Sequence, residues 1–176
     1  MIKLSTAILN VPIISLQTGA VIGVAVRPLI NPNNLKIEGW FATNRFVAGT
    51  QFLPASELRD IARQGMAVDD QTSLTDFEEL PRLAPILRID YQLIGKTVVT
   101  DSKKKLGKVD DYAADLDSMF IQKFYVSPGA LKMFTKDQLT INRSQIIEIT
   151  DKKIVVRDLE ATVPSYFKAP APVFEG

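Results

Sequence analysis

The stretch LIGKTVVTDSKKKLGKVDDYAADLDSMFIQKFYV, residues 93–126, determines how the rest of the chain is interpreted. It predicts three short strands, because two polar turns interrupt its apolar residues. The first turn is basic and contains Lys103, Lys104 and Lys105, and the second turn is acidic. The same pattern occurs once earlier in the chain, so the sequence predicts a repeated unit of short strands.

The composition limits the functions that the chain can have. Its 176 residues are enough for one ordinary domain or two small ones, and 46% of them are hydrophobic, so a core can form. The net charge of +1 gives no global field that would draw the chain to nucleic acid or anionic lipid. The chain has no cysteine and no histidine, which excludes disulfides, a Ser-His-Asp triad, a Cys-His pair and a histidine-rich zinc site. We therefore expect no enzymatic activity, no cofactor and no metal site.

The N-terminal region predicts neither a signal peptide nor a membrane anchor. Pro12 and Gln17 interrupt the apolar residues before a signal-peptide core could form. No segment approaches the roughly 18 apolar residues that a transmembrane helix needs. The lack of cysteine is consistent with a reducing compartment, and we expect a soluble cytoplasmic protein.

Two offsets relate the first part of the chain to the second. Gly23 and Gly107 define an offset of 84 residues. Without a gap, this offset also aligns Ile14 with Val98, Leu35 with Met119, Ile37 with Ile121, and Trp40-Phe41 with Phe124-Tyr125. After a loop of different length, the register resumes at an offset of 88, where residues 52–58 meet residues 140–146. Matching turns and aromatic pairs on a common register indicate an internal duplication, with the length change in a loop, where insertions are tolerated.

Two segments are expected to be helical. Residues 55–62 predict one or two helical turns with Ser56 as the N-cap. In residues 71–92, Thr75 and Glu78 have the spacing of a capping box, although prolines shorten any helix there. We expect this connector to pack against the domains as one or two short helices.

Each copy is about 65–70 residues of short strands with closely spaced turns. This pattern predicts a small closed or nearly closed antiparallel barrel, since closure removes the exposed edges of short strands. We therefore expect a mainly β chain with two small antiparallel β-barrels in tandem, facing each other across a pseudo-two-fold axis. The expected parts are a first barrel (1–70), a connector with a short helix (71–92), a second barrel (93–158) and a proline-containing C-terminal tail (159–176).

Several features of the second copy match one known family. They are Leu93-Ile-Gly-Lys-Thr-Val, the hairpin return Leu106-Gly-Lys-Val-Asp-Asp, Asp115 in the next turn, the strand 121–126, Ser144-Gln-Ile-Ile and the closing stretch 153–158. With these features the second copy resembles the PRC-barrel family. The first copy matches less well, because Val26-Arg27 replaces Asp110-Asp111. Together the copies cover about 80% of the chain, which therefore resembles a tandem PRC-barrel protein.

The resemblance implies two PRC-type barrels without catalytic activity. Members of the family bind protein partners, assist ribosomal RNA processing or electron-transport complexes, or take part in cell division, and the fold does not choose among these. We expect a binding or adaptor protein that acts through protein–protein contacts. The alternatives are an RNA-processing or ribosome-assembly factor and a membrane-surface or electron-transport complex assembly factor. The identity of the protein partner, RNA binding and homo-oligomer formation stay open.

The densest basic cluster consists of Lys103, Lys104 and Lys105, with Lys108 on the following strand. These lysines would contact phosphates of RNA or of an anionic lipid surface, or they would simply keep a hairpin turn soluble. The first copy has the neutral residues 16–20 at this place, so the charge belongs to the second copy alone.

Four aspartates follow the basic cluster, at positions 110, 111, 115 and 117. Carboxylates bind hard cations, but the spacing is not that of an EF-hand, and Asp110 and Asp111 should point to opposite sides of a strand. The alternative is that one aspartate pairs with a lysine while Asp115 and Asp117 shape a turn. Asp110 and Asp111 are candidate partner-binding residues, because the first copy lacks them.

Three further candidate contact residues, Leu131, Met133 and Phe134, lie in an insertion that is too apolar for a plain solvent loop. They would pack on the other barrel or offer an adaptable contact to a partner. In the tail 159–176, aromatic residues stand among prolines, which suits docking on its own chain, a partner-binding peptide or a frayed terminus.

The aromatic pairs Trp40-Phe41 and Phe124-Tyr125 occupy equivalent positions in the two copies. Successive side chains of a strand point to opposite faces, so one member of each pair should face the core. The other member would form an aromatic platform for a partner or for bases, or a contact between the domains.

Overall fold

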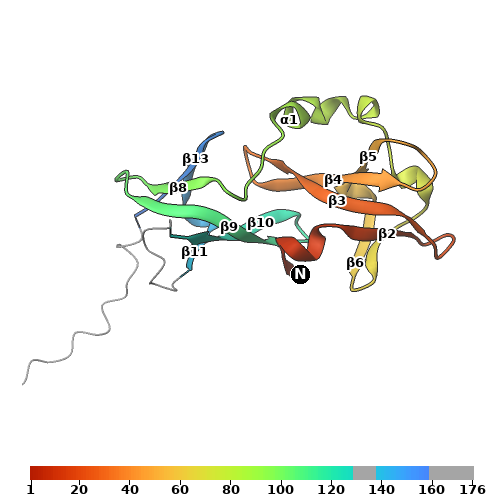
Figure 1. Ribbon diagram of the computed structural model, residues 1–176, viewed down its shortest axis with the longest axis horizontal. Coiled ribbons are helices and arrows are strands. Elements are labelled where there is room, and N and C mark those ends of the chain that lie inside the picture. Colours follow the sequence, from red (N-terminus) through yellow and green to blue (C-terminus); the bar gives the residue numbers. More distant parts are fainter. Residues whose placement is uncertain (129–137, 159–176) are drawn as a thin grey trace, which may run out of the picture.

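The structure is a computed structural model that describes residues 1–128 and 138–158. Among these residues, 13 strands form one large mixed sheet, and Ala84–Ile89 forms the short α-helix α1 (Figure 1). The expectation of a mainly β chain is therefore confirmed.

Two sets of six strands follow one another along the chain. The first set is β2 (Val11–Ser15), β3 (Val21–Asn31), β4 (Lys36–Asn44), β5 (Thr50–Pro54), β6 (Leu58–Ala62) and β7 (Gly65–Val68). The second set is β8 (Thr97–Thr100), β9 (Lys105–Asp115), β10 (Phe120–Ser127), β11 (Leu139–Asn142), β12 (Ile146–Ile149) and β13 (Lys153–Val156). Their hydrogen-bonded orders are β6-β7-β2-β3-β4-β5 and β12-β13-β8-β9-β10-β11, so each strand has a counterpart in the other set.

The strand register reproduces both sequence offsets. Equivalent cross-strand pairs are Pro28–Trp40 and Tyr112–Phe124 between the long strands, and Trp40–Leu53 and Phe124–Ile141 at the strand that follows. The first two pairs differ by 84 residues, and Leu53 and Ile141 differ by 88. The irregularities of register in the long hairpins also fall at equivalent places.

The alignment of Ile14 with Val98 is wrong by one residue. Val98 lies opposite Gly107, whereas Ile13, not Ile14, lies opposite Gly23. The turn between β8 and β9 is thus one residue shorter than the turn between β2 and β3. A sequence alignment without a gap cannot show this difference in turn length.

The strands expected to form closed or nearly closed antiparallel barrels are not all antiparallel. β7 pairs in parallel with β2, and β13 pairs in parallel with β8. The intervening strands supply the long connection that a parallel pair requires. Among the described residues, backbone pairing does not close either set into a barrel. The end strands are joined instead by the 3₁₀ turns Ala55–Glu57 and Arg143–Gln145.

The connector contains the expected short helix, but the helix around Ser56 and the capping role of Thr75 are wrong. Only Ala55–Glu57 is helical in the region around Ser56, because Leu58 to Ala62 pair with β7 as strand β6. Thr75 does not cap a helix, since its backbone forms a β-bridge to Phe52. The connector contains the 3₁₀ turns Gln71–Ser73, Phe77–Glu79 and Pro81–Leu83, and α1 follows them directly.

The two sets meet through equivalent turns. Ile37 N donates to Met119 O at 2.7 Å, and Ile121 N donates to Leu35 O at 3.0 Å. These residues are two pairs related by the offset of 84, so the contact is reciprocal, as it is across a two-fold axis. Leu35 and Met119 both have positive φ, 56° and 59°, so the two turns also share a backbone conformation.

The segments that lead into the two sets are exchanged. β1 (Ile2–Leu4) precedes the first set but pairs with β9 of the second, and α1 precedes the second set but contacts β3 of the first. Ser5, in the 3₁₀ turn Ser5–Ile8, donates to Asp111 at 2.5 Å, and Arg27 pairs with Asp90 at 2.8 Å. The segment that precedes each set in the sequence therefore binds to the other set.

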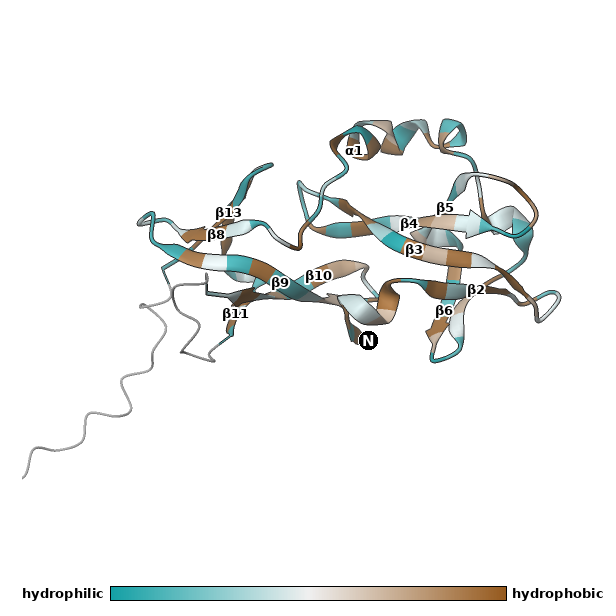
Figure 2. Cartoon of the chain, viewed as in Figure 1, coloured by the Kyte–Doolittle hydropathy of each residue, from teal (hydrophilic) through white to brown (hydrophobic). Residues whose placement is uncertain are grey.

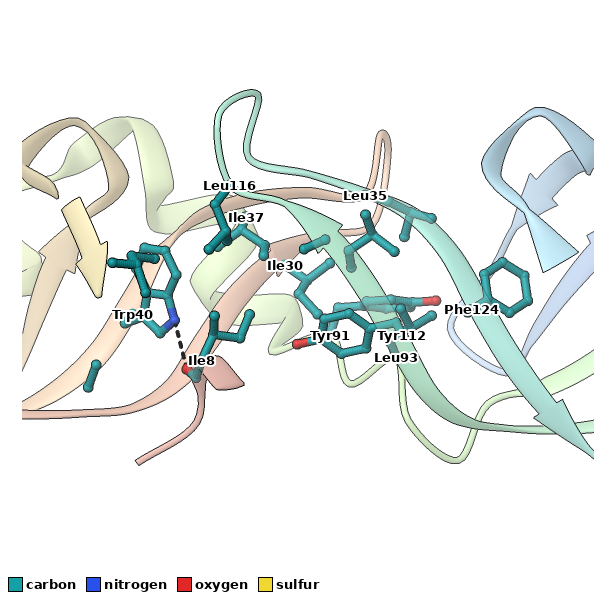
Figure 3. Packing of buried hydrophobic residues seen from close by; sticks show 14 of the residues in the cluster. Ile8, Ile30, Leu35, Ile37, Trp40, Tyr91, Leu93, Tyr112, Leu116 and Phe124 are labelled. Carbon is teal, nitrogen blue, oxygen red and sulfur yellow. Dashed lines mark hydrogen bonds between the residues drawn. The ribbon is translucent and has the colours of Figure 1, made fainter. Parts of the chain in front are cut away.

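One hydrophobic core runs through both sets (Figure 3). Trp40 is fully buried in it, and its indole Nε1 donates to the carbonyl oxygen of Ile8 at 3.1 Å. Ile8 and Leu93, which precede the two sets, are both buried in this core. The core therefore ties the lead-in segments to the sheet.

Candidate functional site

The lysines at positions 103, 104 and 105 are exposed at the turn between β8 and β9. The turn is shaped by polar contacts of its own, because Thr100 Oγ1 accepts from Lys104 N at 3.1 Å and lies 2.7 Å from Ser102 Oγ. Lys108 is exposed farther along β9. The structure therefore gathers three of the four lysines at one tip, which we call the basic turn, and places Lys108 on the strand.

Asp110 and Asp111 serve different contacts. Asp110 accepts from Ser127 Oγ at 2.9 Å and from Gln138 Nε2 at 3.3 Å, whereas Asp111 accepts from Ser5 Oγ at 2.5 Å. In the part of the chain that the structure describes, no group of three or more carboxylates could hold a metal ion. Asp111 is thus a structural contact to the exchanged lead-in, while Asp110 lies at the exposed surface of β9.

The acidic turn binds the N-terminal ammonium group. Met1 N lies 2.7 Å from Asp115 Oδ1 and also contacts Asp117. Ser118 Oγ donates to Asp115 Oδ2 at 2.8 Å. The ammonium group and the Ser118 hydroxyl lower the pKa of Asp115 to about 2, and the two carboxylates raise the pKa of the ammonium group. These aspartates therefore hold the start of β1 against the second set.

This ion pair predicts a change in stability with pH. Because the pKa of Asp115 is lowered to about 2 on folding, its contribution is present above the unfolded pKa of about 4 and is lost as the pH falls to 2. Asp115→Asn should therefore be less stable than the natural chain at pH 5, and the difference should shrink toward pH 2. Thermal melts at intervals of one pH unit measure it.

Acetylation of the N-terminus is the matched control, because it removes the other charge of the pair. The acetylated chain should show the same pH dependence as Asp115→Asn. A stability difference that stays constant from pH 5 to pH 2 would contradict the assignment.

In each aromatic pair one side chain faces the core and the other faces outward, as the sequence predicts. Trp40 and Phe124 are fully buried, whereas Phe41 and Tyr125 are only half-buried on the other face of the strand. Phe41 does not form a free platform, since the ring of Phe77 in the connector lies 5.6 Å from it. The outward aromatic residue of the first set thus packs within the chain.

The other sequence candidates, Leu131, Met133 and Phe134, lie outside the described residues, as does the tail 159–176. Their contacts to a partner or to the other set stay predictions from the sequence. The insertion follows β10, and the tail follows β13.

Sequence reasoning missed a group of exposed apolar side chains in the first set. Its members, which we call the apolar end, are Leu16, Val21, Phe46 and Val47. Phe46 is 66% exposed and Leu16 is 60% exposed. Arg45 N donates to Ile22 O at 2.9 Å and Arg45 Nη1 donates to Val21 O at 3.2 Å, so the chain after β4 stays bound to the start of β3. The available signal was the adjacent apolar pair Phe46-Val47.

Leu16 of the apolar end and the basic turn stand at corresponding places in the two sets, whereas Phe46 and Val47 lie between β4 and β5. Leu16 begins the turn between β2 and β3, and the basic turn joins the equivalent strands β8 and β9. Figure 1 shows these turns at opposite ends of the long axis, and Figure 2 shows the basic turn as hydrophilic. The molecule thus presents two chemically different tips.

The surface pockets repeat with the fold. A pocket of about 350 Å³ lies between the turn 32–35 and β12, and its counterpart of about 100 Å³ lies between the turn 116–119 and β6. Met1 lines the smaller one. Since each site occurs in both sets, these pockets follow from the packing of the turns rather than from a dedicated active site.

Two buried tyrosines have raised pKa values. Burial raises the pKa of Tyr91 to about 12, and burial together with nearby Asp111 raises the pKa of Tyr112. The hydroxyl of Tyr91 is buried and has no hydrogen-bond partner among the described residues. Burial in the core is the main cause of both shifts.

No family model matches this chain, and a search of curated proteins found no match. In the described part of the chain, no helix is long and apolar enough to cross a bilayer.

Proposed function

We propose that the chain is a tandem PRC-barrel protein that binds other proteins as a non-catalytic adaptor. The two sets of six strands support the PRC-type fold, because each set pairs its last strand in parallel with its first and joins its end strands by a 3₁₀ turn. The resemblance of residues 93–158 to that family supports the same interpretation. The duplicated, reciprocal arrangement suits an adaptor, since it offers two similar scaffolds with different tips.

The observation that carries the proposal is the apolar end. Exposed apolar side chains that gather on a surface mark interaction sites, whereas scattered ones need no explanation. Phe46 and Leu16 leave most of their surface exposed and are held on turns of a rigid sheet. An aromatic residue with aliphatic neighbours is a typical centre of a protein interface.

Quantitative affinity capture from the native cell tests this role. Leu16→Ser with Phe46→Ser should reduce recovery of the bound protein at least about tenfold, because loss of a central contact costs more than about 1.4 kcal/mol. Lys103→Glu with Lys105→Glu is the matched control, since it alters the equivalent turn of the second set. The proposal fails if both double variants recover the same proteins in the same amounts as the natural chain.

The basic turn favours RNA binding as a second candidate function. Its three lysines are exposed on one tip, where phosphates are accessible. Lys103→Glu with Lys105→Glu should weaken binding of single-stranded RNA, and the slope of log affinity against log salt should become shallower by about 1.4 for two lost contacts. Fluorescence anisotropy at several salt concentrations measures both effects.

Lys152→Glu with Lys153→Glu is the matched control for the RNA experiment. These two lysines are also exposed and neighbour a different turn, between β12 and β13. Equal losses in the two double variants would show that only net charge matters, and no binding at low salt would exclude the RNA role.

A further inference from the structure

The connector that follows the first set binds the outer edge of β5. Phe52 N donates to Thr75 O at 2.9 Å, and Thr75 N donates to Phe52 O at 3.0 Å. The ring of Phe77 then packs against Phe41 and Phe52, with ring centres 5.6 and 5.9 Å away. This edge of the sheet is therefore covered by the chain itself.

After the β-bridge between Thr75 and Phe52, the connector also forms one side of a pocket. The pocket has a volume of about 420 Å³ and lies between β4, the turn after β5 and α1. Residues of the sheet and of the connector line it: Lys36, Glu38, Pro54, Ala55 and Ser56 on one side, and Leu80, Arg82, Leu83 and Ile86 on the other.

The second set has the same edge and the same pocket. Thr140 in β11 is the counterpart of Phe52, and its side chain is exposed. In the equivalent register, its backbone N–H and carbonyl face away from β10. Within residues 1–128 and 138–158, β11 pairs only with β10, so nothing described here covers this edge.

The counterpart pocket is open on the corresponding side. It has a volume of about 520 Å³ and is lined by Gln122, Lys123, Asn142, Arg143 and Ser144. These residues are equivalent to residues 38, 39 and 54–56 of the first set by the offsets of 84 and 88. The wall that Leu80 to Ile86 provide in the first set has no counterpart among the described residues.

The sequence after β13 has the length and composition to supply that wall. Thr75 lies seven residues after the end of β7, and Val163 lies seven residues after the end of β13. After Thr75 the connector carries Phe77 and Pro81, and after Val163 the tail carries Pro164, Tyr166-Phe167 and Pro170, so both segments have aromatic residues within four positions. An exposed strand edge is usually covered or protected in stable proteins.

We propose that residues 159–176 dock on the second set as the connector docks on the first. The edge of β11 at Thr140, the half-buried ring of Tyr125 and the pocket beside Arg143 form the docking surface, and the apolar and aromatic residues Val163, Tyr166 and Phe167 have the chemistry to occupy it. The inference is independent of the proposed binding function. If the docking occurs, the edge strand and the pocket of each set are covered by the segment that follows that set in the sequence.

Paramagnetic broadening in the full chain tests the docking. The chain has no cysteine, so a nitroxide on Ser165→Cys labels a single site. The label should broaden the backbone amide signals of Lys123, Thr140 and Ser144 and should leave those of the first-set pocket unchanged. A label on Glu78→Cys, an exposed position of the connector, is the matched control, because it should broaden the first-set pocket instead.

A second measurement tests the anchor. Tyr166→Ala with Phe167→Ala should abolish the broadening and should speed amide hydrogen exchange at Thr140 about tenfold or more, since a backbone hydrogen bond is lost. Uniform or absent broadening from Ser165→Cys would overturn the proposal. Broadening that appears only between a labelled and an isotope-enriched copy would also overturn it, because the occupant would then be a second chain.

Discussion

Replacing Trp40 by alanine should lower the free energy of unfolding by about 3–5 kcal/mol, as for other fully buried tryptophans. Trp40 has no exposed surface and lies in the core that both sets share. Its removal leaves a large cavity and an unpaired carbonyl at Ile8, so the exchanged lead-in loses its anchor as well. Urea unfolding followed by circular dichroism measures the change, since Trp40 is the only tryptophan available for fluorescence.

Trp40→Phe is the control that separates packing from hydrogen bonding. It keeps an aromatic ring in the core but removes the indole N–H, so the loss should be smaller, about 1–3 kcal/mol. If Trp40→Ala cost less than about 1 kcal/mol, the shared core would be contradicted.

Replacing Gly107 by alanine should lower the free energy of unfolding by about 2–4 kcal/mol. A Cβ atom there would lie 2.1 Å from the carbonyl oxygen of Ser127, and its φ of 153° disfavours a side chain. Because the obstacle is the backbone of the paired strand β10, it cannot be relieved by a change of rotamer. Chemical unfolding of the variant measures the loss.

Alanine variants of two other glycines separate the steric part of this destabilisation from the backbone-strain part. Gly23→Ala brings only the steric conflict, with a Cβ atom 2.1 Å from Thr43 O, and should cost about 1–3 kcal/mol. Gly19→Ala brings only the backbone strain of φ 70° in open space and should cost about 1–2 kcal/mol. A Gly107→Ala variant no less stable than Gly19→Ala would contradict the close approach of β9 and β10.

The strands and the repeat were predictable because their signals are local. The alternation of Trp40-Phe41 and Phe124-Tyr125 fixes which side chain enters the core, and the turns recur with the same spacing. The parallel pairs were not predictable in this way. β7 and β13 have four residues each, and such short apolar runs do not specify their partner or its direction.

Candidate site residues were predictable from the sequence only where they are neighbours within one turn. The lysines of the basic turn are neighbours in sequence, and the structure leaves them exposed at one tip. The partners of Asp111 and Asp115 are Ser5 and the N-terminal ammonium group, more than 100 residues away, and no local pattern reveals such contacts. The apolar end also draws on two separate turns, and its exposure is known only from the folded chain.

The different chemistry of the two tips explains why a duplicated chain would keep both halves. The scaffold residues are those that recur, such as the two glycines at the close strand approaches. The features that differ are the apolar end of the first set and the basic turn of the second. Interaction partners should therefore distinguish the two halves even though the strands pair alike.

Photo-cross-linking in the native cell tests the central claim most directly. A benzophenone-bearing phenylalanine analogue at Phe46 should yield a discrete adduct with another protein, because this side chain is the most exposed of the apolar end. The same analogue at Lys103 should not yield that adduct. The account would be contradicted if position 46 gave no protein adduct, or if the adduct formed equally from position 103.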